Sequence, residues 1–101
     1  MRRKPPPHPN NLWIARQHAG LGQKTVARLL GHKSRSVISE YENGRLLPSL
    51  ETALRLSVVY DRSLSDLYPE LYKQILQETE ASKSKHRMVT NQSVQAPQTE
   101  L

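Results

Sequence analysis

Helix-breaking residues divide the chain into short segments, and this division restricts the folds that it can adopt. Gly20, Gly31 and Gly44 are followed by a further break at Pro48. Between these breaks the apolar residues recur at three- and four-residue spacing, which is typical of one buried face of a helix. No alternating run is long enough to predict a strand. We therefore expect an all-α fold of short helices.

Five helices are expected within residues 10–68, and a sixth beyond them. Asn10 or Asn11 can cap the first helix, which Gly20 ends. The second helix is predicted at residues 23–30, and the third at residues 34–43 with Ser34 as its cap. The fourth helix follows Ser49, and the residues expected to turn mostly inward are Leu50, Leu54, Leu56, Ser57 and Val58. A short fifth helix follows Asp61 or Ser63. Pro69 suits the first turn of a sixth helix, which we expect over residues 69–80.

The two ends of the chain lack any such pattern. Residues 1–9 (MRRKPPPHP) cannot fold alone, because successive prolines lack amide donors and favour an extended conformation. Residues 81–101 are polar and without periodicity. We expect a disordered basic, proline-rich arm at the start and a disordered tail at the end.

The composition excludes several classes of function. The absence of cysteine rules out disulfides, thiolate zinc sites and thiol catalysis. The four histidines have no metal-ligand spacing, and no glycine-rich phosphate loop or catalytic set of nucleophile and base is present. We expect no metal, no cofactor and no enzymatic activity. The chain also lacks an apolar run that could span a bilayer and any export signal, so we expect a cytoplasmic protein without a membrane role.

Basic residues are concentrated in the first half of the chain. Residues 11–45 carry six basic and two acidic side chains, whereas residues 46–80 carry three basic and six acidic ones. A localised basic surface attracts phosphate groups. This distribution favours a nucleic-acid partner over a protein-interaction module that has the same helices but no role on DNA.

Two of the predicted helices, 23–30 and 34–43, flank a tight turn. Small residues, Ala27 and Gly31, stand where the helices must approach each other closely. The angle between the helices is expected to be filled by Leu30, Ile38 and Tyr41, and we also place Trp13 in the core. This arrangement predicts a helix-turn-helix.

The outer face of the second motif helix is polar and comprises Arg35, Ser36, Ser39 and Glu40. A helix fits the major groove, where its first turns meet base edges. Arg35 can bind guanine through two hydrogen bonds, Glu40 can accept from cytosine, and either serine can donate or accept. We expect these four residues to make the base contacts.

Three stretches, GLGQKTVARLLG (20–31), SRSVISEYENG (34–44) and PSLETALRLS (48–57), occur in a characteristic order. Through them residues 12–67 resemble the Cro/phage-repressor (XRE) family of helix-turn-helix domains. The resemblance implies a five-helix, λ-repressor-like domain that binds double-stranded DNA as a homodimer at two-fold operators. It also implies phosphate contacts, which together with the turn residues we assign to Gln23, Lys33, Ser34, Asn43 and Arg45.

The chain departs from the family pattern at three places. Gly22 stands where a serine commonly caps the first motif helix, and the turn 31–34 is one residue longer than usual. Glu40 is acidic where relatives often carry a basic or polar residue, so it needs a specific basic partner close to phosphates.

The sequence leaves several roles open. The chain is expected to be a sequence-specific transcriptional regulator, or an antitoxin-type autorepressor whose tail from residue 81 binds a partner protein. The basic arm is either an inert leader or a segment that lies along the duplex. The apolar side of the sixth helix, which is Leu71, Tyr72, Ile75 and Leu76, is either an additional core element or, as we prefer, a dimer surface.

Overall fold

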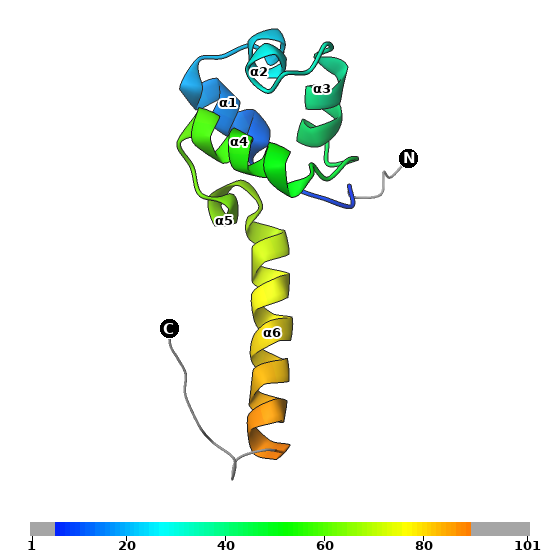
Figure 1. Cartoon of the computed structure of the whole chain (residues 1–101), viewed down its shortest axis with the longest axis vertical. Helices are drawn as coiled ribbons and strands as arrows, with labels where there is room; N and C mark the ends of the chain where they lie inside the picture. Colours follow the sequence, from blue (N-terminus) through cyan, green and yellow to red (C-terminus); the bar gives the residue numbers. More distant parts are fainter. Residues whose placement is uncertain (1–5, 90–101) are drawn as a thin grey trace, which may run out of the picture.

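The structure, a computed structural model, describes residues 6–89, and all regular secondary structure in that range is helical (Figure 1). The six helices are α1 (Leu12–Ala19), α2 (Gln23–Leu29), α3 (Ser36–Glu42), α4 (Leu50–Tyr60), α5 (Leu64–Leu67) and α6 (Pro69–Val89). The predicted all-α fold is therefore confirmed. Within the described range no helix is both long and apolar enough to cross a membrane.

Helices α1 to α5 form a compact head around a single core, and α6 projects from it (Figure 1). Helix α1 packs on α3 and α4, α2 packs on α3, and α5 connects α4 to α6. The buried apolar side chains are Leu12, Ala15, Val26, Ala27, Leu30, Ile38, Tyr41, Leu56, Tyr60, Leu67 and Tyr68. Of the two aromatic residues assigned to the core, Tyr41 lies there, whereas Trp13 is 55% exposed on α1.

The helix ends follow the predicted capping residues in most places. The hydroxyl groups of Ser49 and Ser63 accept hydrogen bonds from the amides of Thr52 and Asp66, at 3.2 and 3.1 Å. Asp61, the alternative cap of α5, instead ends α4 in a left-handed conformation. At α1 the side chain of Asn10 accepts from the amide of Leu12 at 2.9 Å. These caps satisfy backbone groups that the helix ends would otherwise leave unpaired.

Helix α4 presents a different face to the core than the sequence suggested. Leu56 is buried as expected and Ser57 is partly buried, but Leu50 and Val58 are 71% and 80% exposed, and Leu54 is also exposed. Apolar residues occupy more than half of the circumference of this helix, so its periodicity allows two stripes. Tyr60 and Leu56 occupy the buried stripe, and residues 50, 54 and 58 form an exposed one.

The predicted limits of two helices were wrong. Helix α3 begins at Ser36 rather than at residue 34, because the Ser34 hydroxyl accepts from the Ser36 amide at 3.1 Å in the preceding turn. Helix α6 continues to Val89, although a disordered tail was expected from residue 81. Residues 81–89 contain no glycine or proline and several good helix formers, which sustain a helix without an apolar stripe. Residues 90–101 of the expected tail lie outside the described residues.

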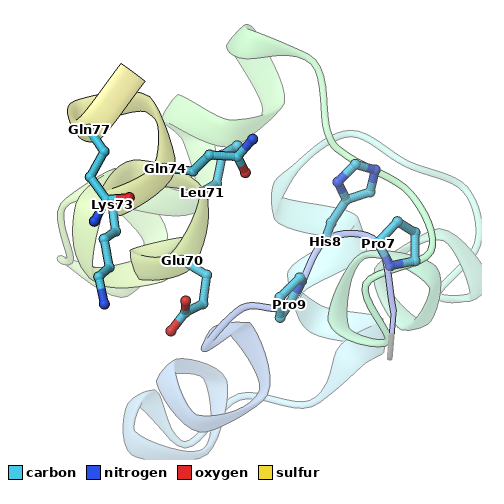
Figure 2. A pocket seen from close by; sticks show the side chains of 8 residues that line it. All are labelled: Pro7, His8, Pro9, Glu70, Leu71, Lys73, Gln74 and Gln77. Carbon is cyan, nitrogen blue, oxygen red and sulfur yellow. The ribbon is translucent and has the colours of Figure 1, made fainter. Parts of the chain in front are cut away.

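The described part of the N-terminal arm is also ordered against the head, contrary to expectation. We call residues 6–10 the strap. The amide of His8 donates to the carbonyl of Gly44 at 3.0 Å, and the Asn10 side chain donates to the carbonyl of Tyr41 at 2.8 Å. On its other side a cleft of about 380 Å³ separates the strap from α6 (Figure 2). The strap is thus attached to the loop after α3, while residues 1–5 lie outside the described range.

Candidate nucleic-acid interface

The turn between α2 and α3 sets the angle of the helix-turn-helix. Gly31 has a φ of 79°, a left-handed conformation that favours glycine. The next amide, that of His32, donates back to the carbonyl of Ala27 at 2.8 Å, which closes the end of α2. The His32 ring then lies 6.5 Å from the ring of Tyr41 on α3. The turn therefore bends the chain sharply and is held against the helix that follows.

The inner face of α3 is buried against α1 and α2. Ile38 and Tyr41 contribute to the core together with Leu30, as the sequence predicted for the angle between the motif helices. Ala27 is 3% exposed, which leaves no room for a larger side chain where α2 packs on α3. The apolar contacts thus determine which side of α3 faces outward.

A buried ion pair reinforces this packing. The Arg16 guanidinium of α1 donates to both carboxylate oxygens of Glu42 at the end of α3, at 2.5 and 3.1 Å. A third N–H, on Nη1, donates to the carbonyl of Leu21 at 3.0 Å. The hydrogen bond to Glu42 outweighs the cost of burial and raises the pKa of Arg16 above its ordinary value. The pair therefore connects α1 to α3 through two parallel hydrogen bonds from one guanidinium to one carboxylate.

Gln23 joins the same network. Its side-chain amide donates to Glu42 at 3.0 Å, so the first residue of α2 is tied to the last residue of α3. Sequence reasoning assigned Gln23 to phosphate but did not identify Arg16 or Glu42. Arg16 follows the buried Leu12 by four positions, and Glu42 follows the buried Ile38 by four. In the sequence, a charged residue therefore stands at a core-facing position of each helix, and this pattern could have predicted the ion pair.

The outer face of α3 carries the residues predicted to meet base edges. Arg35 and Ser36 are exposed at the start of the helix, and Ser39 and Glu40 are partly exposed one turn later. Glu40 has a basic partner, because Arg45 lies 3.4 Å from its carboxylate. The four side chains are thus brought to one region of the surface, and none of them is buried by another part of the described chain.

The residues predicted to contact phosphate fall into two groups. Lys33 and Ser34 are exposed in the turn before α3, and Asn43 and Arg45 are exposed directly after it. Asn43 also donates to the Ser39 hydroxyl at 3.4 Å, which continues the polar face beyond the helix. Gln23 stands apart from these four, because it is partly buried and its amide is engaged by Glu42.

Among residues 6–89 no three histidine, cysteine or acidic side chains are grouped so that they could hold a metal ion. The outer face of α3 is short, exposed and polar, with a basic residue at its start and further basic residues in the turns on both sides. A helix is narrow enough for the major groove to admit it, and polar side chains are the groups that can hydrogen-bond to base edges there.

Comparison with known families agrees with this geometry. A family model described as Helix-turn-helix matches residues 14–67, which is more than half of the chain. The chain belongs to the XRE-type helix-turn-helix family. Its members are DNA-binding regulatory domains, so the protein is a DNA-binding regulator of this type. No curated protein matches the chain.

Proposed function

We propose that this protein is a sequence-specific, cytoplasmic transcriptional regulator that reads a two-fold operator through α3. The observation that carries the proposal is the exposed polar face of α3, held at its back by the Arg16–Glu42 pair. A reading helix with a rigid back loses little conformational freedom when it enters the groove. This XRE-type regulator therefore presents a preorganised recognition surface.

The proposed base contacts come from Arg35, Ser36, Ser39 and Glu40. Arg35 and Ser36 stand at the first turn of α3, which is the part that enters the groove most deeply in this motif. Glu40 accepts from cytosine while Arg45 neutralises its charge against nearby phosphates. Contacts with the phosphate backbone of the DNA are assigned to Gln23, Lys33, Ser34, Asn43 and Arg45. The contact of Gln23 requires the second N–H of its side-chain amide, because the first donates to Glu42.

The proposed assembly is a homodimer that pairs through the start of α6. Tyr72, Ile75 and Leu76 are about half exposed there, and they continue into an apolar groove of about 260 Å³. The groove is lined mainly by apolar side chains of the α3–α4 loop and of α4 to α6, including Leu47, Leu50, Leu64 and Leu71. One reading helix covers only half of a symmetric operator, which favours a second copy of this chain as the occupant.

Selection of bound oligonucleotides from a random pool tests the reading of sequence. We expect a motif with two related halves, and we expect Arg35→Ala to relax selection at one position in each half. The loss of discrimination there should be about 1–3 kcal/mol, because one bidentate contact with guanine disappears. Binding of unrelated sequences should change less. An equal loss on every sequence would mean that Arg35 contacts only phosphate.

Sedimentation equilibrium tests the assembly. Ile75→Glu places a charge in the proposed interface and should weaken self-association by at least about tenfold. Val58→Glu is a matched control, because Val58 is an exposed apolar residue in a separate groove between α2 and α4. If the control weakens association and Ile75→Glu does not, the dimer surface lies on α4 instead.

A further inference from the structure

Two neighbouring asparagines connect the end of α3 to the end of α5. The side chain of Asn10 donates to the carbonyl of Tyr41, in the last turn of α3, at 2.8 Å. Asn11 donates twice to α5, from its backbone amide to the carbonyl of Leu67 at 2.9 Å and from its side chain to the carbonyl of Asp66 at 3.0 Å. We call Asn10 and Asn11 the asparagine pair. Carbonyls in the last turn of a helix depend on partners outside that helix, and the asparagine pair supplies such partners to both helices.

The side chain of Asn10 uses both of its polar groups. Besides Tyr41, its amino group donates to the carbonyl of His8 at 2.9 Å, and its oxygen accepts from the amide of Leu12 at 2.9 Å, which caps α1. Both donors and the oxygen of one planar amide are therefore engaged. A carboxylate of the same shape would keep the cap but would face the two carbonyls without a hydrogen to donate. The contact with α3 thus requires an amide at this position.

The connection has consequences because α3 and α5 pack mainly on other helices. Helix α3 packs on α1 and α2, whereas α5 packs on α4 and α6. Helix α5 has only four residues, and α6 leaves the head directly after it (Figure 1). The direction in which α6 leaves therefore depends on how α5 is held. Through the asparagine pair, α5 is held by the same segment that holds the end of α3.

We propose that the asparagine pair sets the orientation of α3 relative to α6 and thereby determines the half-site spacing that the homodimer reads. This inference rests on the proposed function, since it assumes that two copies associate through the start of α6 and that each inserts α3 into one half of the operator. In this arrangement Asn10 and Asn11 are positioning residues, because they act on DNA only through α3.

A small change in this orientation has a large effect on the operator. Successive base pairs are about 3.4 Å apart along the duplex. Because two copies in a homodimer are related by symmetry, any shift of α3 along the duplex occurs twice. A shift of about 1.7 Å in each copy therefore changes the required spacing by a whole base pair. The contacts that hold α5 to the end of α3 thus bear directly on which operators are bound.

The first test measures binding to operators in which the selected half-sites are moved closer together or further apart in steps of a base pair. The wild type should bind its preferred spacing at least about tenfold more tightly than the neighbouring ones, since a half-site out of register loses contacts as a mismatched site does. Asn10→Asp should reduce this preference by at least about threefold, because the hydrogen bond to Tyr41 is lost.

Gln17→Glu is the matched control for Asn10→Asp. Gln17 is exposed on α1, and its substitution makes the same change from an amide to a carboxylate. This variant should keep the spacing preference of the wild type. The preference is a ratio of two affinities of the same variant, so a smaller fraction of folded protein does not alter it. A purely structural role of Asn10 would therefore leave the ratio unchanged.

A second variant weakens the asparagine pair on its other side. Asn11→Ala removes the exposed hydrogen bond to Asp66 and leaves the backbone bond to Leu67 in place. It should reduce the spacing preference less than Asn10→Asp does. The combined variant Asn10→Asp/Asn11→Ala should exceed the larger single effect by less than about twofold, because the two residues act in series along one connection.

A third measurement needs no DNA. The chain contains no cysteine, so Ser36→Cys places a single spin label on α3 of each copy. In the proposed homodimer the distance between the two labels should be narrowly distributed. Asn10→Asp in this background should broaden the distribution, and Gln17→Glu should not.

The outcomes distinguish the two proposals. A selected site with a single half, or a labelled protein without a dipolar interaction between copies, would overturn the proposed assembly and this inference with it. Two-fold selection with an unchanged spacing preference in Asn10→Asp would overturn only the inference about the asparagine pair. An unchanged distribution of label distances in Asn10→Asp would overturn the same inference, because α3 would then be held without this contact.

Discussion

The inner and outer faces of α3 use the same type of side chain for opposite purposes. Glu42 and Glu40 stand two positions apart, yet their side chains are 5% and 38% exposed. Glu42 accepts three hydrogen bonds from Arg16 and Gln23, whereas Glu40 accepts one long bond from Arg45. Glu42 connects α3 to α1 and α2, whereas Glu40 remains on the surface.

This difference indicates that separate residues of α3 determine how the helix packs on the head and how it recognises DNA. The inner residues determine how α3 lies on α1 and α2, so changes there alter the fold of the head. The outer residues are not part of the buried core, so they can vary with the operator at little cost in stability. The comparison therefore predicts that stability and DNA binding respond to different substitutions.

The largest effect is expected from Glu42→Ala. Removal of this carboxylate leaves Arg16 buried without its counter-charge, which should lower the free energy of unfolding by about 4 kcal/mol. Glu40→Ala is the matched control and should cost less than about 1 kcal/mol, since its pair with Arg45 is exposed. Urea unfolding followed by circular dichroism measures both values. Equal losses in the two variants would refute the distinction between the faces.

A second prediction concerns the loop at the end of α3. Gly44→Ala should lower the free energy of unfolding by about 3 kcal/mol, because it adds a steric clash to the strain of a left-handed residue. Gly20→Ala carries the strain alone and should cost about 1–2 kcal/mol. Deletion of residues 1–9 should abolish the difference between the two variants. If the difference survives the deletion, the strap is not what occupies the space beside Gly44.

Much of the fold follows from local signals in the sequence. Gly31 and the apolar spacing around it predict the two motif helices, and Ser49 and Ser63 mark the starts of α4 and α5, because a serine side chain satisfies amides that a new helix leaves unpaired. The outer face of α3 could be identified from helix geometry: once Ile38 and Tyr41 point inward, Ser36, Ser39 and Glu40 are directed away from them, and Arg35 precedes the first helical residue.

The features that sequence reasoning missed depend on contacts between distant segments. The strap joins His8 to Gly44, and no local pattern indicates that a proline-rich arm will find that loop. The inward face of α4 was misjudged, because Leu50 and Val58 fit a helical stripe as well as Leu56 does. The continuation of α6 to Val89 was missed because the prediction relied on an apolar stripe, whereas a solvent-exposed helix requires only residues of high helix propensity.

The smallest effects are expected from buried polar groups that, unlike Glu42, have no partner. Within the described residues the hydroxyls of Tyr60 and Tyr68 are buried and accept or donate no hydrogen bond. Tyr60→Phe and Tyr68→Phe should each raise the free energy of unfolding at neutral pH by about 1 kcal/mol, because a desolvated hydroxyl is removed. Tyr72→Phe, on the exposed side of α6, is the control and should have no such effect.

The same tyrosines predict a loss of stability in alkali. Burial raises the pKa of Tyr60 and of Tyr68 from 10.0 to about 12. A pKa that is higher in the folded state stabilises the protein fully below pH 10, and this contribution disappears as the pH rises through about 12. Each phenylalanine variant should therefore gain about 2 kcal/mol relative to the wild type between pH 10 and pH 12, measured by urea unfolding at a series of pH values. A constant difference across that range would show that the two hydroxyls are hydrated in the folded protein, in contrast to the desolvated side chain of Glu42.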